Sequence, residues 1–291
     1  MQERWVSVHI YLKGNIDVFL IRVLPKLLGQ LAGNFSQYFY VRYFDPKPHL
    51  RLRLNTNKYT EITELLIGKL EEFIAEKEDT RFEIEHYDFV HYMAEIERYG
   101  GDKMISLAEE SFQLSSNVVL SIMQEHDWNY DHAIGFGIKL HILFFTSANL
   151  DPQVKKSILE RTYFGWMANF INHNPSLTPE LVQEAFSKSY NRQEKKLGLI
   201  KKKLMRSLES RFKKENDPLF EWVTGTKKIH EKYTLAVMAE KNIDPGFPPI
   251  TSDDERIGRI YESTLHMTNN RLGIMNIDES FLAYLLLKLL Y

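Results

Sequence analysis

Residues 37–54 read QYFYVRYFDPKPHLRLRL, and their pattern indicates how the N-terminal third of the chain folds. Gln37 to Phe44 is dense in Tyr, Phe and Val, a composition that favours a β-strand. The dipeptide Asp45-Pro46 ends that strand, and Lys47-Pro48 is a turn signal. His49 to Leu54 alternates leucine with basic residues, which is the period of a second strand. The segment therefore predicts a β-hairpin.

The regions on either side extend this pattern. Further strands are predicted at residues 5–12 and 81–87, and an amphipathic helix at 61–77. A helix at 17–31 should be interrupted at Pro25. Beyond Gly101 only helical periodicity is found, with helices predicted at 104–124, 131–147, 152–169, 179–212, 253–267 and 278–290, the last two after a proline-rich break at 244–249. We predict an α+β fold, in which a strand-rich N-terminal third with an antiparallel sheet packs against a mostly helical remainder as one domain over residues 1–291.

The composition narrows the class of protein. The 291 residues are 44% hydrophobic and 26% charged, with a net charge of -2, which is ordinary for a globular protein and gives no general reason to expect nucleic acid. Cysteine is absent, which excludes disulfides, thiolate catalysis and Cys-ligated metal sites. The N-terminus has no signal-peptide pattern and no apolar run is long enough to span a bilayer, so a cytoplasmic protein is expected.

Two arginines on the predicted strand at His49–Leu54 are candidate ligand-binding residues. Side chains alternate between the faces of a strand, so His49, Arg51 and Arg53 point to the face opposite the leucines. Neighbouring guanidinium groups suit a ligand with more than one carboxylate or phosphate. The alternative is that they are two surface arginines paired with nearby acids, and the strand by itself does not decide between these readings.

Two further segments contain groups that could take part in chemistry. Arg98 precedes the Gly100-Gly101 pair, which marks a tight turn or a close backbone approach. His266 lies at the end of a predicted helix and could act as a general acid or base, although a lone His there could equally be a cap or a core residue.

Other motifs point to structure or stay open. No metal-protease, Walker-loop, dinucleotide-binding or α/β-hydrolase motif occurs, and neither a metal site nor a cofactor is predicted. Gly135-Phe136-Gly137 lies within a helical run and is interpreted as a site of helix packing. The basic stretch Lys188–Lys214 has helical spacing. It could be a solvated face or a docking surface for an acidic peptide, a partner protein or tRNA.

Taken together, these segments resemble one family, the C-terminal elimination domain of class I lanthipeptide dehydratases of the nisin type, which also occurs alone in thiopeptide-type bacteriocin biosynthesis. The specific part is the run from Arg42 to Arg53, and the resemblance extends over almost the whole chain. Supporting matches are the Trp5 strand, Glu97-Arg98-Tyr99-Gly100-Gly101, Ala108-Glu109 with Phe112, and His266-Met267 with Asn270-Arg271-Leu272.

The resemblance implies a lyase that expels glutamate from glutamylated Ser or Thr of a ribosomally made precursor peptide, giving dehydroalanine or dehydrobutyrine. Arg51, Arg53 and Arg98 would bind the glutamyl group and stabilise developing charge, and His266 would transfer the proton. Arg42, His49, Tyr99 and Arg271 are expected to contribute to substrate binding. A separate glutamyl-tRNA-dependent glutamylation subunit is the expected partner, and this chain itself is not expected to contact tRNA.

Two departures and two rival functions accompany this resemblance. Ser115-Ser116 stand where the family often has Asp-Ser, and the large glutamylation module is missing from the sequence. One rival is a pyridine-forming [4+2] cycloaddition enzyme of a thiopeptide pathway. The other is a non-catalytic subunit that binds the precursor peptide.

Overall fold

The computed structural model describes residues 4–76, 79–209, 217–239 and 252–291. The chain forms two compact units. The sheet unit comprises Met1–Ala94 and Phe112–Trp128, and the helical unit comprises Glu95–Ser111 and Asn129–Tyr291. The predicted α+β class is confirmed, and each unit is described separately below. That the chain acts as a single domain stays a prediction.

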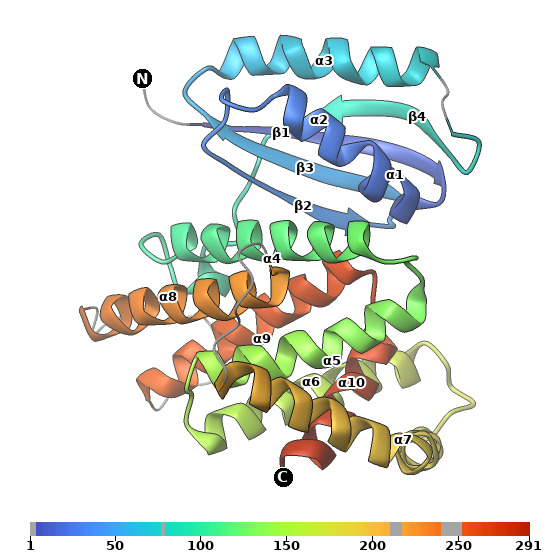
Figure 1. Cartoon of the computed structure of the whole chain (residues 1–291), viewed down its shortest axis with the longest axis vertical. Coiled ribbons are helices and arrows are strands. Elements are labelled where there is room, and N and C mark those ends of the chain that lie inside the picture. The colour runs from blue at the N-terminus through green and yellow to red at the C-terminus, as the bar shows by residue number, and fades with distance from the viewer. Residues whose placement is uncertain (1–3, 77–78, 210–216, 240–251) are drawn as a thin grey trace. The chain divides into compact units, whose positions relative to one another are not determined.

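The sheet unit has a split βαβ arrangement (Figure 1). Its elements are β1 (Arg4–Gly14), α1 (Ile16–Arg22), α2 (Leu24–Gln30), β2 (Gln37–Tyr43), β3 (His49–Thr56), α3 (Tyr59–Glu76) and β4 (Phe82–Phe89). The strands are all antiparallel, in the order β2-β3-β1-β4. The predicted hairpin is therefore present as β2–β3. The helical break is present too, since Pro25 lies in the first turn of α2.

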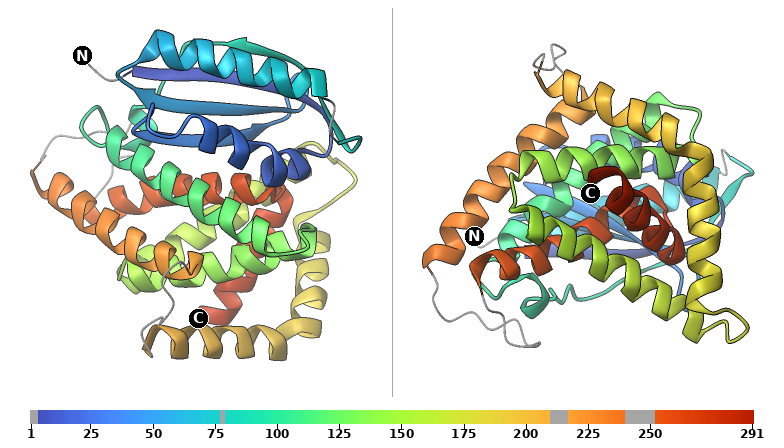
Figure 2. Two further views of the ribbon diagram at one scale, coloured as in Figure 1. Left: turned by 45° about the horizontal axis from the view of Figure 1, so that its top comes forward. Right: turned by 90° about the horizontal axis from the view of Figure 1, so that it is seen from below.

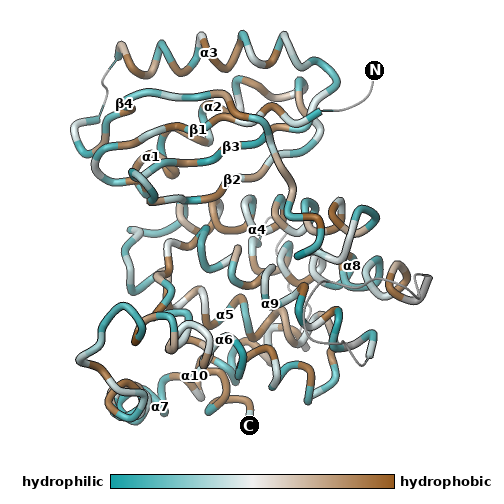
Figure 3. The backbone as a smooth tube through the Cα atoms, turned by 180° about the vertical axis from the view of Figure 1, so that it is seen from behind, coloured by the Kyte–Doolittle hydropathy of each residue, from teal (hydrophilic) through white to brown (hydrophobic). Residues whose placement is uncertain are grey.

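The leucines of β3 belong to the covered face of the sheet. Leu50, Leu52 and Leu54 have no exposed surface, and the register places them beside the equally buried Val8 and Ile10 of β1. Burying a leucine side chain contributes roughly 1.5–3 kcal/mol, so this alternation fixes which way β3 faces. Helix α3 packs against β1 and β4. Apolar residues recur along α3 among polar ones, as its bands of colour show (Figure 3).

The helical unit is built from a short 3-10 turn and long helices. The turn η1 covers Glu97–Tyr99, and the helices are α5 (Tyr130–Ser147), α6 (Pro152–Asn172), α7 (Pro179–Glu209), α8 (Pro218–Ala239), α9 (Asp253–Leu272) and α10 (Asn276–Leu290). The boundary between the units falls within α4 (Ile105–Glu125). Helix α10 lies among α5, α6 and α7 (Figure 2).

The centre of this unit depends on close helix contact at a glycine. A Cβ added at Gly137 of α5 would lie 2.8 Å from Cδ1 of Ile274 and 3.3 Å from Cδ2 of Leu282. The interpretation of Gly135-Phe136-Gly137 as a packing site is therefore confirmed at Gly137. At Gly135 an added Cβ would meet nothing within 4 Å.

The structure differs from the sequence expectations in two helices. Helix α8 was not predicted, although Trp222, Ile229, Tyr233 and Val237 are buried at helical spacing. Helix α9 continues to Leu272, so His266 lies inside it rather than at its end. Three predicted features lie outside the described residues: the C-terminal end of the helix at 179–212, the C-terminal end of the basic stretch, and the break at 244–249. Within the described residues, no helix is both long and apolar enough to cross a membrane.

Candidate active site

The C-terminal helical hairpin brings a histidine and a carboxylate together. Helix α9 ends at Leu272 and is capped by Gly273, whose φ of 82° is a left-handed conformation that favours glycine; α10 begins at Asn276. This short connection returns the chain so that Glu279 of α10 faces His266 of α9. The Nδ1 atom of His266 lies 2.8 Å from Oε1 of Glu279.

The Glu279 carboxylate is buried and doubly hydrogen-bonded. Its side chain is 1% exposed. Asn269 lies one turn beyond His266 on α9 and donates from Nδ2 to Oε2 of Glu279 over 3.0 Å. The imidazole of His266 remains 23% exposed. A carboxylate held in this way orients the imidazole, an arrangement that recurs where a histidine transfers protons.

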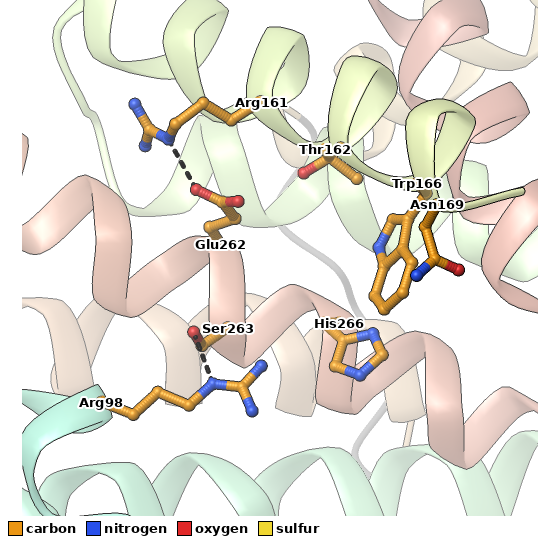
Figure 4. Close-up of a pocket in the computed structure, with 9 residues that line it drawn as sticks. Arg98, Arg161, Thr162, Trp166, Asn169, Glu262, Ser263 and His266 are labelled. Carbon is orange, nitrogen blue, oxygen red and sulfur yellow. Dashed lines mark hydrogen bonds and ion pairs between the residues drawn. The ribbon is translucent and has the colours of Figure 1, made fainter. Parts of the chain in front are cut away.

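The exposed side of His266 faces a pocket of about 290 Å³ (Figure 4). The lining comes from η1, α6 and α9: Arg98, Arg161, Thr162, Gly165, Trp166, Asn169, Glu262, Ser263 and His266. The indole of Trp166 lies over the imidazole, with ring centroids 5.0 Å apart and an interplanar angle of 35°. The pocket therefore combines an aromatic wall with a positioned proton-transfer group.

Arg98 enters the same pocket from η1. Its Nε donates to Oγ of Ser263 over 3.0 Å, and its Nη1 lies 2.8 Å from Oε2 of Glu95. The Arg98 side chain is 42% exposed, so it remains accessible to a ligand. Gly100, which follows η1, has a φ of 94°, and an added Cβ there would lie 2.7 Å from Sδ of Met104. Glycine is thus required at the turn that presents Arg98.

The pocket has a second cation that the sequence reasoning missed. Arg161 of α6 donates from Nε to Oε2 of Glu262 on α9 over 2.6 Å, and both side chains are about one-third exposed or less. Neither residue, nor Trp166 or Glu279, belongs to a recognisable local motif. For Glu279, the sequence offered one indication of a special role, which is its place in the acidic first turn of α10.

The sheet unit holds the other predicted cluster, on the face opposite the leucines. The guanidinium carbon of Arg51 lies 3.4 Å from the centroid of the Tyr43 ring, and its Nε donates to Nε2 of His49 over 3.1 Å. Arg53 is 8% exposed, with its guanidinium carbon 4.9 Å from the ring centroid of Tyr92. The predicted alternation of arginines and leucines on β3 is confirmed.

Histidines on this face are held neutral. Burial lowers the pKa of His9 to about 4, and the positive charge of Arg51 adds to the effect. Burial also lowers the pKa of His49, as does the charge of Arg51. A neutral His49 can accept the Arg51 hydrogen bond through Nε2 while Nδ1 donates to the carbonyl of Lys47 over 2.8 Å.

All four residues predicted to bind substrate are buried; His49, described above, is 1% exposed. Arg42 of β2 lies on the leucine face, 5% exposed, and is ion-paired with Asp17. Arg271 is fully buried and donates from Nη1 to the carbonyl of Met267 over 2.8 Å. Tyr99 is 3% exposed, and burial raises its pKa to about 12. These placements suit structural roles, and substrate contact by these residues stays a prediction.

The predicted catalytic residues, with the predicted substrate-binding residue His49, thus divide between the units. Arg98 and His266 line one pocket of the helical unit. His49, Arg51 and Arg53 form one cluster in the sheet unit. That the two groups act on one substrate stays a prediction.

Solved structures share the fold at low sequence identity. TsrL aligns over 99% of this chain and 94% of its own, with a TM-score of 0.69 and 15% identity. The pyridine synthase TbtD from thiomuracin biosynthesis aligns over 98% and 97%, with a TM-score of 0.68 and 14% identity. The tRNA-dependent lantibiotic dehydratase MibB from Microbispora sp. 107891 aligns over 97% of this chain and 27% of its own, with a TM-score of 0.58 and 17% identity.

Sequence relatives lead to the family. The nisin biosynthesis protein NisB of Lactococcus lactis subsp. lactis is 30% identical over 138 residues, which are 44% of this chain and 13% of that protein. The subtilin biosynthesis protein SpaB of Bacillus subtilis is 30% identical over 126 residues, 43% of this chain and 12% of that protein. The matches thus span about an eighth of either relative. The profile of the family described as "Lantibiotic biosynthesis dehydratase C-term" matches residues 5–291, and the chain belongs to that family.

Proposed function

We propose that the protein is a lyase that eliminates glutamate from glutamylated Ser or Thr residues of a ribosomally made precursor peptide. The observation that carries the proposal is that His266, oriented by the buried Glu279, lines the same pocket as the accessible guanidinium of Arg98. Membership of the lantibiotic dehydratase C-terminal family supports it.

The chemistry requires one base and one or more cations. The imidazole of His266 removes the Cα proton of the glutamylated residue. The Cα–H electron pair forms the Cα=Cβ double bond as the Cβ–O bond breaks and glutamate leaves as a carboxylate. A positioned base contributes roughly 100- to 10,000-fold in rate. Arg98 stabilises the developing negative charge, and a preorganised donor of this kind contributes roughly 100- to 1000-fold.

The sheet-unit arginines have a supporting role in the proposal. Arg51 and Arg53 bind carboxylate groups of the glutamyl substituent, for which paired guanidinium groups are suited. The elimination transfers no net electrons, so it requires no redox cofactor. The glutamylated peptide is supplied by a separate glutamyl-tRNA-dependent enzyme in the cytoplasm.

The test is incubation of the purified chain with a peptide bearing a glutamyl ester on Ser or Thr, followed by mass spectrometry. The proposal expects loss of one glutamate and formation of a dehydroamino acid. Binding of the peptide without loss of glutamate would overturn the proposal in favour of a binding subunit. Conversion of an already dehydrated peptide to a pyridine product, with the glutamylated peptide left intact, would overturn it in favour of cycloaddition.

A further inference from the structure

We propose that Glu279, supported by Asn269, is a positioning residue that holds His266 in the tautomer with the proton on Nδ1 and the Nε2 lone pair directed into the pocket. The inference rests on the proposed function for the role of His266. Glu279 takes no direct part in the elimination step; its proposed role is to orient the imidazole of His266.

The burial of Glu279 is the first argument. An ionised carboxylate taken out of water is costly unless its oxygens are hydrogen-bonded. Each oxygen of Glu279 has one partner, with Nδ1 of His266 at 2.8 Å and Nδ2 of Asn269 at 3.0 Å. Glu279 also lies in the first turn of α10, where the helix dipole favours a negative charge.

The anchoring of the first turn of α10 is the second argument. On one side of Glu279, Asp278 accepts a hydrogen bond from the Tyr130 hydroxyl of α5 over 2.5 Å. On the other side, Ser280 donates to the carbonyl of Tyr163 on α6 over 2.7 Å. Consecutive residues of α10 are thus tied to different neighbouring elements, which fixes the carboxylate against the imidazole.

The geometry of the imidazole is the third argument. An ionised carboxylate can only accept hydrogen bonds, so Nδ1 of His266 must carry the proton in this contact. In the neutral imidazole the opposite ring nitrogen, Nε2, then carries the lone pair. His266 lines the pocket, and Trp166 packs against the ring at 5.0 Å between centroids, which restricts its rotation (Figure 4). Nε2 is therefore the proton acceptor that a bound substrate meets.

The inference predicts a specific pattern of kinetic coupling. His266→Ala should lower the rate of glutamate release roughly 100- to 10,000-fold. Because Glu279 acts through His266, Glu279→Ala should also lower this rate, but by no more than His266→Ala does. The double variant should be no slower than His266→Ala. Activity in Glu279→Ala equal to the wild type would overturn the inference. So would a double variant clearly slower than His266→Ala, because the two losses would then be independent.

A spectroscopic readout separates positioning from mere support of the fold. Nitrogen-15 NMR of the imidazole distinguishes a protonated ring nitrogen from one with a lone pair. The wild type should show His266 protonated at Nδ1. Glu279→Ala should shift it toward the Nε2-protonated tautomer that predominates in a free histidine side chain. An Nε2-protonated His266 in the wild type would overturn the inference.

Two further variants control for folding. Glu279→Gln keeps an oxygen that can accept from Nδ1, and Asn269 can rotate its amide to meet the new NH2 group. Among the described residues the Oδ1 atom of Asn269 has no hydrogen-bond partner. This variant should therefore keep the Nδ1 proton and more activity than Glu279→Ala. Asp278→Asn keeps an oxygen that can accept from the Tyr130 hydroxyl, so it removes a neighbouring charge but preserves the anchor, and the tautomer should stay as in the wild type.

These experiments separate the inference from the function on which it rests. If the wild type releases no glutamate, the proposed function fails, while the tautomer in the wild type and in Glu279→Ala still decides whether Glu279 positions His266. If the wild type is active and His266→Ala is inactive but Glu279→Ala is fully active, the function stands and the inference fails.

Discussion

Arg51 and Arg42 show at the residue scale how alternation along strands assigns different tasks to similar side chains. Arg51 lies with His49 and Tyr43 on the face of the sheet opposite the leucines. Arg42 lies on the leucine face and pairs with Asp17. The register, rather than the residue type, makes one guanidinium a candidate ligand-binding group and the other a buried ion-pair partner.

Substitution of these arginines should separate activity from stability. Arg51→Ala should cause the glutamylated peptide to accumulate in a coupled reaction with the glutamylating enzyme, with little change in the melting temperature. Arg42→Ala should instead lower the free energy of unfolding by about 1–3 kcal/mol, because it removes a buried charged partner. Equal dehydration by wild type and Arg51→Ala, measured by mass spectrometry, would contradict the role of Arg51.

Helix α5 shows at the element scale that, of two glycines in one helix, only one is required by the packing. Gly135 and Gly137 are near neighbours in the same helix, but an added Cβ meets other atoms only at Gly137, where Ile274 and Leu282 pack. The sequence gives no way to distinguish the two, because the contact is made with residues more than a hundred positions later in the chain.

The two glycines form a matched pair for a stability experiment. Gly137→Ala should destabilise the protein by about 1–3 kcal/mol, the cost of inserting a methyl group into a packed contact. Gly135→Ala should stabilise it by roughly 0.5–1 kcal/mol, since alanine is the better helix former. Urea denaturation of both variants checks this. A similar midpoint for the two would show that α5 does not pack closely at Gly137.

Elements and contacts could be predicted where the sequence pattern that indicates them lies within a few neighbouring residues. The β2–β3 hairpin and the arginine face of β3 follow from alternation within a few residues, and the structure confirms them. The apolar spacing of Trp222, Ile229 and Tyr233 was also present in the sequence, so α8 could have been predicted. The pairing of His266 with Glu279 required the turn at Gly273, and the contact of Arg161 with Glu262 required two helices to pack, so neither followed from spacing.

Buried histidines give the whole molecule a pH-dependent stability. His141 of α5 is 4% exposed, and burial lowers its pKa to about 4. In the unfolded chain the imidazole of His141 takes up a proton at its ordinary pKa of 6.5. The contribution of the neutral His141 to the free energy of unfolding is therefore fully present above pH 6.5 and is lost as the pH falls from 6.5 toward 4. The loss attributable to His141 is on the order of 3 kcal/mol.

Removal of the titrating group should flatten this dependence. His141→Gln should show a smaller fall in the urea midpoint between about pH 7 and about pH 5 than the wild type does. His9 titrates in the same window and leaves a residual slope. Equal slopes for wild type and variant would mean that His141 is not held neutral by burial.

The most direct test of the account is the rate of glutamate release from a pre-glutamylated peptide by wild type, Arg98→Ala and His266→Ala. Lys228→Ala is the control because Lys228 is an exposed residue of α8, outside both the pocket and the basic stretch. We expect each pocket variant to be slower by roughly 100-fold or more, with an unchanged far-ultraviolet spectrum, and the control to match the wild type. Wild-type rates in both pocket variants would contradict the assignment of elimination to this pocket.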